Sequence, residues 1–175
     1  MDKPMFTLHF VLMSFGYKFR DLFLPRINIL REAGIGPGFH VLDYGCGPGS
    51  YVSGAAELVG KTGKVYALDI HPLAIQRVRN IASKGQLENV ETICSDCETG
   101  LPDESVDVIL LYDTFHSLRD PNRVLRELCR VLRPNGILSF SDHHMGGDEI
   151  ASKVTNAGLF RFLRKDKRTY TFMKG

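Results

Sequence analysis

A short glycine-rich segment constrains the fold of this chain more than any other part of the sequence. It runs from Val41 to Tyr51 and reads VLDYGCGPGSY, an apolar stretch followed by glycines at positions 45, 47 and 49. Apolar and β-branched residues favour a buried strand, and glycines permit a tight turn and a close approach of the backbone to a ligand. The segment therefore predicts a strand, a glycine turn at a ligand site and then a helix.

The residues of this turn indicate what kind of ligand it suits. Its spacing is G-x-G-x-G, whereas the dinucleotide fingerprint is G-x-G-x-x-G. Pro48 has no backbone N–H to donate, and the carboxylate of Asp43 repels a phosphate dianion. Both features suit S-adenosylmethionine, which carries a sulfonium and an ammonium group but no phosphate.

A second apolar segment, Lys64–Ile70, ends in an acid. Asp69 lies 20 positions after Gly49, and a carboxylate at this place can accept hydrogen bonds from both hydroxyls of a ribose. Pro72 is suited to the first turn of the helix that follows. An adenosine-containing ligand is therefore expected between the glycine turn and Asp69.

These segments resemble those of the class I S-adenosylmethionine-dependent methyltransferases, and the resemblance continues through residues 100–107 (GLPDESVD) and 130–136 (RVLRPNG). The chain is most similar to a small-molecule branch that includes C-methyltransferases of quinone biosynthesis, whose fourth strand ends in a histidine-bearing loop like Thr114–Leu118. The resemblance implies transfer of a methyl group from S-adenosyl-L-methionine to a small-molecule acceptor by in-line displacement. The cofactor contacts that it implies, at the ends of the first four strands, are Asp43, Tyr44, Gly45, Cys46, Gly47, Gly49, Asp69, Ile70, Asp96, Cys97 and Tyr112.

Helical and strand patterns alternate along the chain and predict an α/β fold, because such alternation requires a parallel sheet covered on both faces. After the first strand, the expected strands are 65–69, 90–95, 108–111 and 137–141, and the expected helices are 27–33, 50–58, 73–83, 121–132 and 148–158. Pro134–Gly136 is expected to form a turn, with Asn135 in the left-handed conformation. The last two apolar runs, 159–163 and 168–173, predict an antiparallel hairpin.

The predicted architecture is a Rossmann-like, doubly wound, mostly parallel seven-stranded sheet with a C-terminal antiparallel hairpin and helices on both faces. One methyltransferase domain is expected over residues 1–175, with the cofactor-binding core at 35–175 and a helical lid or substrate segment at 1–34.

The N-terminal segment is rich in phenylalanine. Its uncharged run, Met5–Tyr17, is interrupted by His9 and is shorter than the roughly 20 residues of a membrane span, so no transmembrane helix is expected. The resemblance implies that this segment covers the cofactor and brings Phe15, Tyr17 and Phe19 to the substrate. Core packing and peripheral membrane contact through residues 4–24 are the alternatives.

Candidate catalytic residues follow the fourth and fifth strands, at the sheet edge where open α/β folds bind ligands. His116 is the candidate general base, because histidine exchanges protons near neutral pH, and Asp113 is a second catalytic candidate. His143 is a candidate substrate contact. Asp113 with Asp142 and His143 also resembles the magnesium site of catechol-type O-methyltransferases, but a histidine replaces an asparagine ligand, so no metal is predicted.

Composition excludes several classes of function. Lys and Arg number 22 against 20 Asp and Glu, and the net charge of +2 provides no basic field for nucleic acid. Four scattered cysteines without a secretory signal indicate a reducing cytoplasm. A catalytically silent S-adenosylmethionine-binding module and an NAD-dependent oxidoreductase remain alternatives, and the oligomeric state, including a dimer, stays open.

Overall fold

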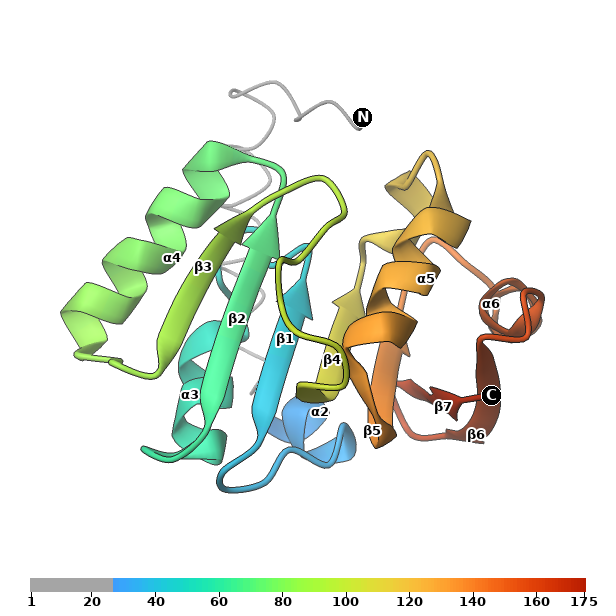
Figure 1. Ribbon diagram of the computed structural model, residues 1–175, viewed down its shortest axis with the longest axis horizontal. Coiled ribbons are helices and arrows are strands. Elements are labelled where there is room, and N and C mark those ends of the chain that lie inside the picture. Colours follow the sequence, from blue (N-terminus) through green and yellow to red (C-terminus); the bar gives the residue numbers. More distant parts are fainter. Residues whose placement is uncertain (1–26) are drawn as a thin grey trace.

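The computed structural model describes residues 27–175 and shows a central sheet with helices packed on it (Figure 1). The expected substrate residues Phe15, Tyr17 and Phe19 and the expected membrane-contact segment 4–24 lie outside the described residues. The elements are α2 (Ile27–Glu32), β1 (His40–Tyr44), α3 (Val52–Val59), β2 (Lys64–Asp69), α4 (Pro72–Gly85), β3 (Val90–Cys94), β4 (Val106–Tyr112), the 3₁₀ turn η1 (Phe115–Ser117), α5 (Pro121–Val131), β5 (Leu132–Ser141), α6 (Gly147–Thr155), β6 (Phe160–Lys165) and β7 (Tyr170–Lys174).

Within residues 27–175, seven strands form one sheet in the order β3-β2-β1-β4-β5-β7-β6. The β1, β2, β3, β4 and β5 neighbours pair in parallel, whereas β7 pairs antiparallel with both β5 and β6. The predicted mostly parallel seven-stranded sheet with a C-terminal antiparallel hairpin is therefore confirmed. The hairpin joins the sheet through its second strand, β7.

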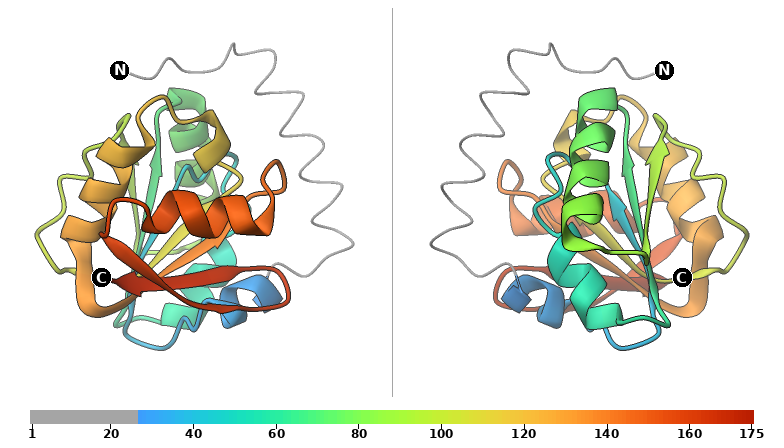
Figure 2. Two further views of the ribbon diagram at one scale, coloured as in Figure 1. Left: turned by 90° about the vertical axis from the view of Figure 1, so that its right-hand side faces the viewer. Right: turned by 90° about the vertical axis from the view of Figure 1, so that its left-hand side faces the viewer.

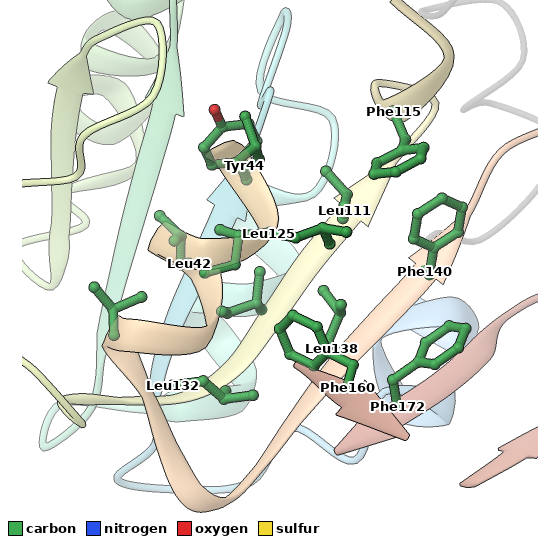
Figure 3. Packing of buried hydrophobic residues seen from close by; sticks show 14 of the residues in the cluster. Leu42, Tyr44, Leu111, Phe115, Leu125, Leu132, Leu138, Phe140, Phe160 and Phe172 are labelled. Atoms are coloured by element: carbon green, nitrogen blue, oxygen red, sulfur yellow. The ribbon is translucent and has the colours of Figure 1, made fainter. Parts of the chain in front are cut away.

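Two layers of helix bury the two faces of the sheet. Successive strand residues point to opposite faces, so Leu42 of β1 packs in the cluster that contains α5 and α6, while Val41 packs in the cluster that contains α2 and α3. Figure 2 shows α3 and α5 on opposite faces. In the larger cluster, Phe115 and Phe140 meet edge to face at a ring distance of 5.3 Å, and Phe140 in turn meets Phe172 (Figure 3).

Two details differ from the sequence prediction. Pro134–Gly136 lies inside β5 as an irregularity, because Val106 still pairs with Leu132 before the register shifts to the pair Val108–Ile137. Asn135 is not among the residues with positive φ, so its predicted left-handed conformation is wrong. The chain still folds back here as a bulge within β5, because the segment Leu132–Ile137 lies opposite only Val106–Val108 and a Cβ at Gly136 would lie 2.6 Å from Cδ1 of Leu132.

No helix in the part of the chain from residue 27 to 175 is long and apolar enough to cross a bilayer.

Candidate functional site

Within residues 27–175, the predicted site residues follow the strands at one edge of the sheet. The chain proceeds from β1 to β2 and β3, then returns to β4 on the other side of β1. In open α/β sheets, such a change of direction leaves a ligand crevice at the carboxyl ends of the strands. The residues after β1, β2, β3, β4 and β5 therefore define the candidate site.

The glycine turn after β1 is packed tightly at one end and open in its middle. Gly45 and Cys46 donate their N–H groups to the carbonyl oxygen of Leu68, at 2.8 and 2.9 Å. Gly45 has φ of 77°, and a Cβ there would lie 2.3 Å from Oγ1 of Thr114, so a side chain has neither the conformation nor the space. At Gly47 a Cβ would meet no described atom within 4 Å. The open face of the turn is therefore at Gly47.

Asp69, at the end of β2, fixes this turn. Its Oδ2 accepts a hydrogen bond from the N–H of Gly47, and its Oδ1 accepts one from the N–H of His71, both at 2.8 Å. Burial raises the pKa of Asp69, and the two N–H donors oppose that rise. A carboxylate has about four acceptor positions, so Asp69 keeps acceptor capacity beyond these two bonds. Ile70, the next predicted contact, is partly buried beside it.

Three predicted contacts around the turn have buried side chains. Asp43 is 2 % exposed near the end of β1. Tyr44 donates its hydroxyl to the carbonyl oxygen of Asp96 at 3.2 Å, which ties β1 to the loop after β3. Burial and the carboxylates of Asp43 and Asp69 raise the pKa of the Cys46 thiol. Cys46 is therefore a protonated thiol and not a nucleophile.

The loop after β3 presents a buried acceptor atom. Oδ2 of Asp96 is buried, and no group among residues 27–175 donates a hydrogen bond to it, whereas its Oδ1 lies 3.9 Å from a guanidinium nitrogen of Arg123. Buried carboxylate oxygens are normally satisfied, so this atom is suited to a donor on a ligand. The N–H of Cys97 donates to Oγ of Ser95 at 3.3 Å, and burial raises the pKa of the Cys97 thiol to about 11.

Tyr112 has its side chain in the core. It is 5 % exposed, meets Tyr51 edge to face at 5.1 Å, and shares a 2.8 Å hydrogen bond with Oγ of Ser139. Burial raises the pKa of its hydroxyl strongly. The structure therefore places this phenol among core residues, while the Tyr112 backbone ends β4 at the site edge.

Two aspartate–histidine pairs link the loops after β4 and β5. Asp142, after β5, accepts from the N–H of His116 at 3.0 Å and lies 2.9 Å from its ring Nδ1. Asp113, after β4, accepts from the N–H of His143 at 3.2 Å and lies 2.6 Å from its ring Nδ1. Each carboxylate thus holds a histidine from the other strand. The ring of His144 lies between the two, with centroids 4.2 Å from His116 and 3.9 Å from His143.

Asp142 is the buried member of this group, with a side chain that is 0 % exposed. Burial raises its pKa, but hydrogen bonds from the His116 ring and from the N–H groups of His116 and His144 outweigh burial and lower the pKa below its ordinary value. Asp142 is therefore ionised at neutral pH.

A cation could in principle lie in the same group, because Asp113, Asp142 and His143 offer ligand atoms within 4.8 Å of one another. However, both oxygens of Asp142 already accept hydrogen bonds from His116, and one also accepts from His144. These bonds compete with metal coordination. That the site holds no metal remains a prediction.

Sequence reasoning missed two residues that shape the site. Thr114 packs on Gly45 and so joins the loop after β4 to the glycine turn. Glu127 of α5 accepts from the N–H of Thr99 at 2.8 Å and from its hydroxyl at 2.7 Å, which holds the loop after β3. A helical pattern places Glu127 on the polar face of α5, but it does not distinguish an acid that binds a distant loop from one that only faces solvent.

Comparison with known proteins assigns the family. Residues 35–171 match the family model described as a methyltransferase domain. The chain belongs to this methyltransferase family. The sheet edge described above lies within the residues that match this methyltransferase domain.

The relatives of this methyltransferase domain are mostly longer than it. It is 29 % identical over 154 residues to the ubiquinone/menaquinone biosynthesis C-methyltransferase UbiE of Pseudoalteromonas translucida, covering 87 % of this chain and 60 % of the relative. It is 34 % identical over 127 residues to the aklanonic acid methyltransferase DauC of a Streptomyces species, covering 72 % and 53 %. The chain therefore spans little more than half the length of these relatives.

A solved structure of similar size shows the same architecture. The methyltransferase domain superposes on a SAM-dependent methyltransferase from Aquifex aeolicus with a TM-score of 0.79 and 28 % identity, covering 88 % of this chain and 92 % of the other.

Proposed function

We propose that this domain binds S-adenosyl-L-methionine and transfers its methyl group to a small-molecule acceptor. The observation that carries the proposal is the buried, unsatisfied Oδ2 of Asp96, on the same sheet edge as the glycine turn and Asp69. That oxygen suits the amino group of an adenine, and Asp69 suits the hydroxyls of a ribose. When bound, the cofactor supplies an electrophilic methyl group on a sulfonium.

The remaining proposed contacts surround the same crevice. The open face at Gly47 suits the amino-acid portion of the cofactor, and Asp43 gives this region the negative charge that an ammonium or sulfonium group favours. Gly45, Cys46 and Gly49 form the turn itself. The other proposed cofactor contacts lie on either side of this turn and are Tyr44, Ile70, Cys97 and the backbone of Tyr112. The hydrogen bond from Gly47 to Asp69 holds the turn in shape before any ligand arrives.

The class of acceptor is supported by the relatives. One is named for ubiquinone and menaquinone biosynthesis and another for aklanonic acid. By analogy with these relatives, we propose that the acceptor of this domain is a small organic molecule with an ionisable hydroxyl or an acidic C–H. Asp113 and His143, whose pair borders the crevice at the end of β4, are proposed to face this acceptor.

Calorimetry tests the cofactor assignment. We expect S-adenosylmethionine and S-adenosylhomocysteine to bind and NAD not to bind. Asp69→Asn should raise the Kd for S-adenosylmethionine at least tenfold, because a hydrogen bond to a charged acceptor is worth about 1.5–3 kcal/mol.

Asp107→Asn is the matched control. Asp107 likewise accepts a backbone N–H, from His40 at 2.8 Å, but at the opposite end of the sheet. The Kd of Asp107→Asn for S-adenosylmethionine should equal that of the unmodified protein. Binding of NAD without binding of S-adenosylmethionine would refute the assignment and favour the oxidoreductase alternative.

Methyl transfer is tested separately with radiolabelled S-adenosylmethionine and a panel of acceptors: 1,4-dihydroxynaphthalene, an anthraquinone carboxylic acid and simple phenols. We expect labelled product from at least one. Tight cofactor binding without transfer to any of them would instead favour a silent binding module.

A further inference from the structure

The His116–Asp142 pair has the geometry of an oriented base. We propose that Asp142 is a positioning residue that fixes the ring of His116, so that Nε2 takes a proton from the acceptor during methyl transfer. This inference rests on the proposed function and adds a residue and a protonation state to it.

Three contacts fix residue 116 against one carboxylate. The backbone N–H of His116 donates to Oδ2 of Asp142 at 3.0 Å, and ring Nδ1 lies 2.9 Å from both carboxylate oxygens. An ionised carboxylate can only accept hydrogen bonds. In the neutral ring, Nδ1 of His116 must therefore carry the single proton, which leaves the lone pair on Nε2.

The two partners of the pair differ in solvent exposure. The side chain of Asp142 is 0 % exposed, whereas that of His116 is 32 % exposed. The two ring nitrogens lie on different edges of the imidazole, so the edge away from Asp142 carries Nε2. The buried carboxylate thus holds one edge of the ring and leaves the other for a ligand.

Packing on both sides of His116 makes this placement rigid. Thr114 contacts Gly45 of the proposed cofactor turn, and its carbonyl oxygen accepts the N–H of Ser117 at 3.1 Å. Phe115 is 4 % exposed and packs edge to face on Phe140 of β5 (Figure 3). His116 therefore lies only two residues after Thr114, whose side chain contacts the cofactor turn.

The proposed step balances without a further reactant. The acceptor forms its new bond to the methyl carbon with the electron pair of an O–H or C–H bond, while the carbon–sulfur bond breaks and its pair stays on sulfur as a neutral thioether. The acceptor proton passes to Nε2 of His116. The charge of Asp142 stabilises the imidazolium that results, and solvent later removes the proton.

The neighbouring pair is a less suitable base. The side chain of His143 is 56 % exposed and that of Asp113 is 17 % exposed, so solvent weakens the influence of that carboxylate on its ring. His144 donates its N–H to Asp142 at 3.1 Å and adds to the group that holds this carboxylate. The structure thus singles out His116 among the three histidines.

The first test reads the proton directly and needs no acceptor. In histidine-¹⁵N-labelled protein, long-range ¹H–¹⁵N spectra distinguish the two tautomers, and loss of one signal set in His116→Gln assigns residue 116. We expect the unmodified protein to carry the proton on Nδ1. In Asp142→Asn we expect a shift of the population towards Nε2–H, because an amide no longer enforces donation from Nδ1.

The second test is kinetic and uses whichever acceptor from the panel above is methylated. His116→Gln and Asp142→Asn should each lower kcat by about 10²–10⁴-fold, the usual range for general base catalysis, with the Kd for S-adenosylmethionine unchanged. Because the two residues act as one unit, the double variant should be no slower than His116→Gln. Asp107→Asn again serves as the control and should keep kcat.

The outcomes separate this inference from the proposed function. Failure of the unmodified protein to bind S-adenosylmethionine would count against the proposed function. A His116 ring protonated on Nε2 in the unmodified protein, or full kcat in either variant, would overturn the positioning role. Loss of activity in chelator, with activity restored by Mg²⁺ or Zn²⁺, would also overturn it and assign the group to a cation.

Discussion

Glu127 offers a stability prediction whose size follows from the structure. Its carboxylate accepts from Arg130 through Nε and a terminal nitrogen, both at 2.8 Å, and from the N–H and hydroxyl of Thr99. The Arg130 hydrogen bonds, opposed by burial and assisted by Thr99, lower the pKa of Glu127 from its ordinary 4.5 to about 2.

That difference in pKa sets an upper limit of about 3 kcal/mol on the contribution of ionised Glu127 to the free energy of unfolding, at 1.36 kcal/mol per pH unit. Arg130 is 37 % exposed, so screening by solvent reduces the value to about 2 kcal/mol. Because the pKa is lower in the folded state, this stability is present above pH 4.5 and is lost as pH falls towards 2.

Urea unfolding of the unmodified protein and Glu127→Gln tests this reasoning. At pH 7 the variant should be less stable by about 2 kcal/mol, and by pH 3 the difference should fall to less than about half of that value. Glu149→Gln is the matched control, since Glu149 pairs with Lys153 on the surface, where the side chains are 47 % and 55 % exposed. It should change stability by less than about 1 kcal/mol. A Glu127→Gln deficit that stays constant between pH 7 and 3 would refute the assigned cause.

Three further changes test other parts of the structure. Gly45→Ala should raise the Kd for S-adenosylmethionine tenfold or more in calorimetry, because its Cβ would lie 2.3 Å from Thr114, and an unchanged Kd would contradict this packing. Leu128→Ala, at a fully buried position of α5, should cost about 2–5 kcal/mol in urea unfolding, and a loss below 1 kcal/mol would show that the site is not close-packed. Tyr112→Phe should cost about 1–2 kcal/mol by the same assay, because Ser139 loses its buried partner, and unchanged stability would disprove that hydrogen bond.

The sequence predicted the architecture because its signals are local and periodic. The strand segments are apolar, the glycine turn follows the first of them, and Pro72 and Pro121 open helices α4 and α5. The predicted boundaries differ from the observed ones by only a few residues at most elements. The main difference is at Pro134–Gly136, where the chain folds back as a bulge inside β5 without a left-handed Asn135, because Leu132 already pairs with Val106.

The site was predictable in part. Positions at strand ends follow from topology, so the sequence could place Asp69, Asp96 and His116 on one edge. Side-chain direction could not be predicted, because it depends on packing between distant segments. The phenol of Tyr112 in the core, the Thr99–Glu127 bond and the crossed histidine partners of Asp113 and Asp142 are all of this kind.

The crossed aspartate–histidine pairs have a consequence for motion. The amide of His116 is held by the strand-end carboxylate of β5, and the amide of His143 by that of β4. If the loop after β4 moves away, it breaks the bond of its His116 to Asp142 and also the bond that its Asp113 makes to His143 of the other loop. The loop after β5 breaks the same two bonds when it moves. Local opening of the two loops should therefore be a single cooperative event, so that hydrogen exchange gives the two amides the same protection factor.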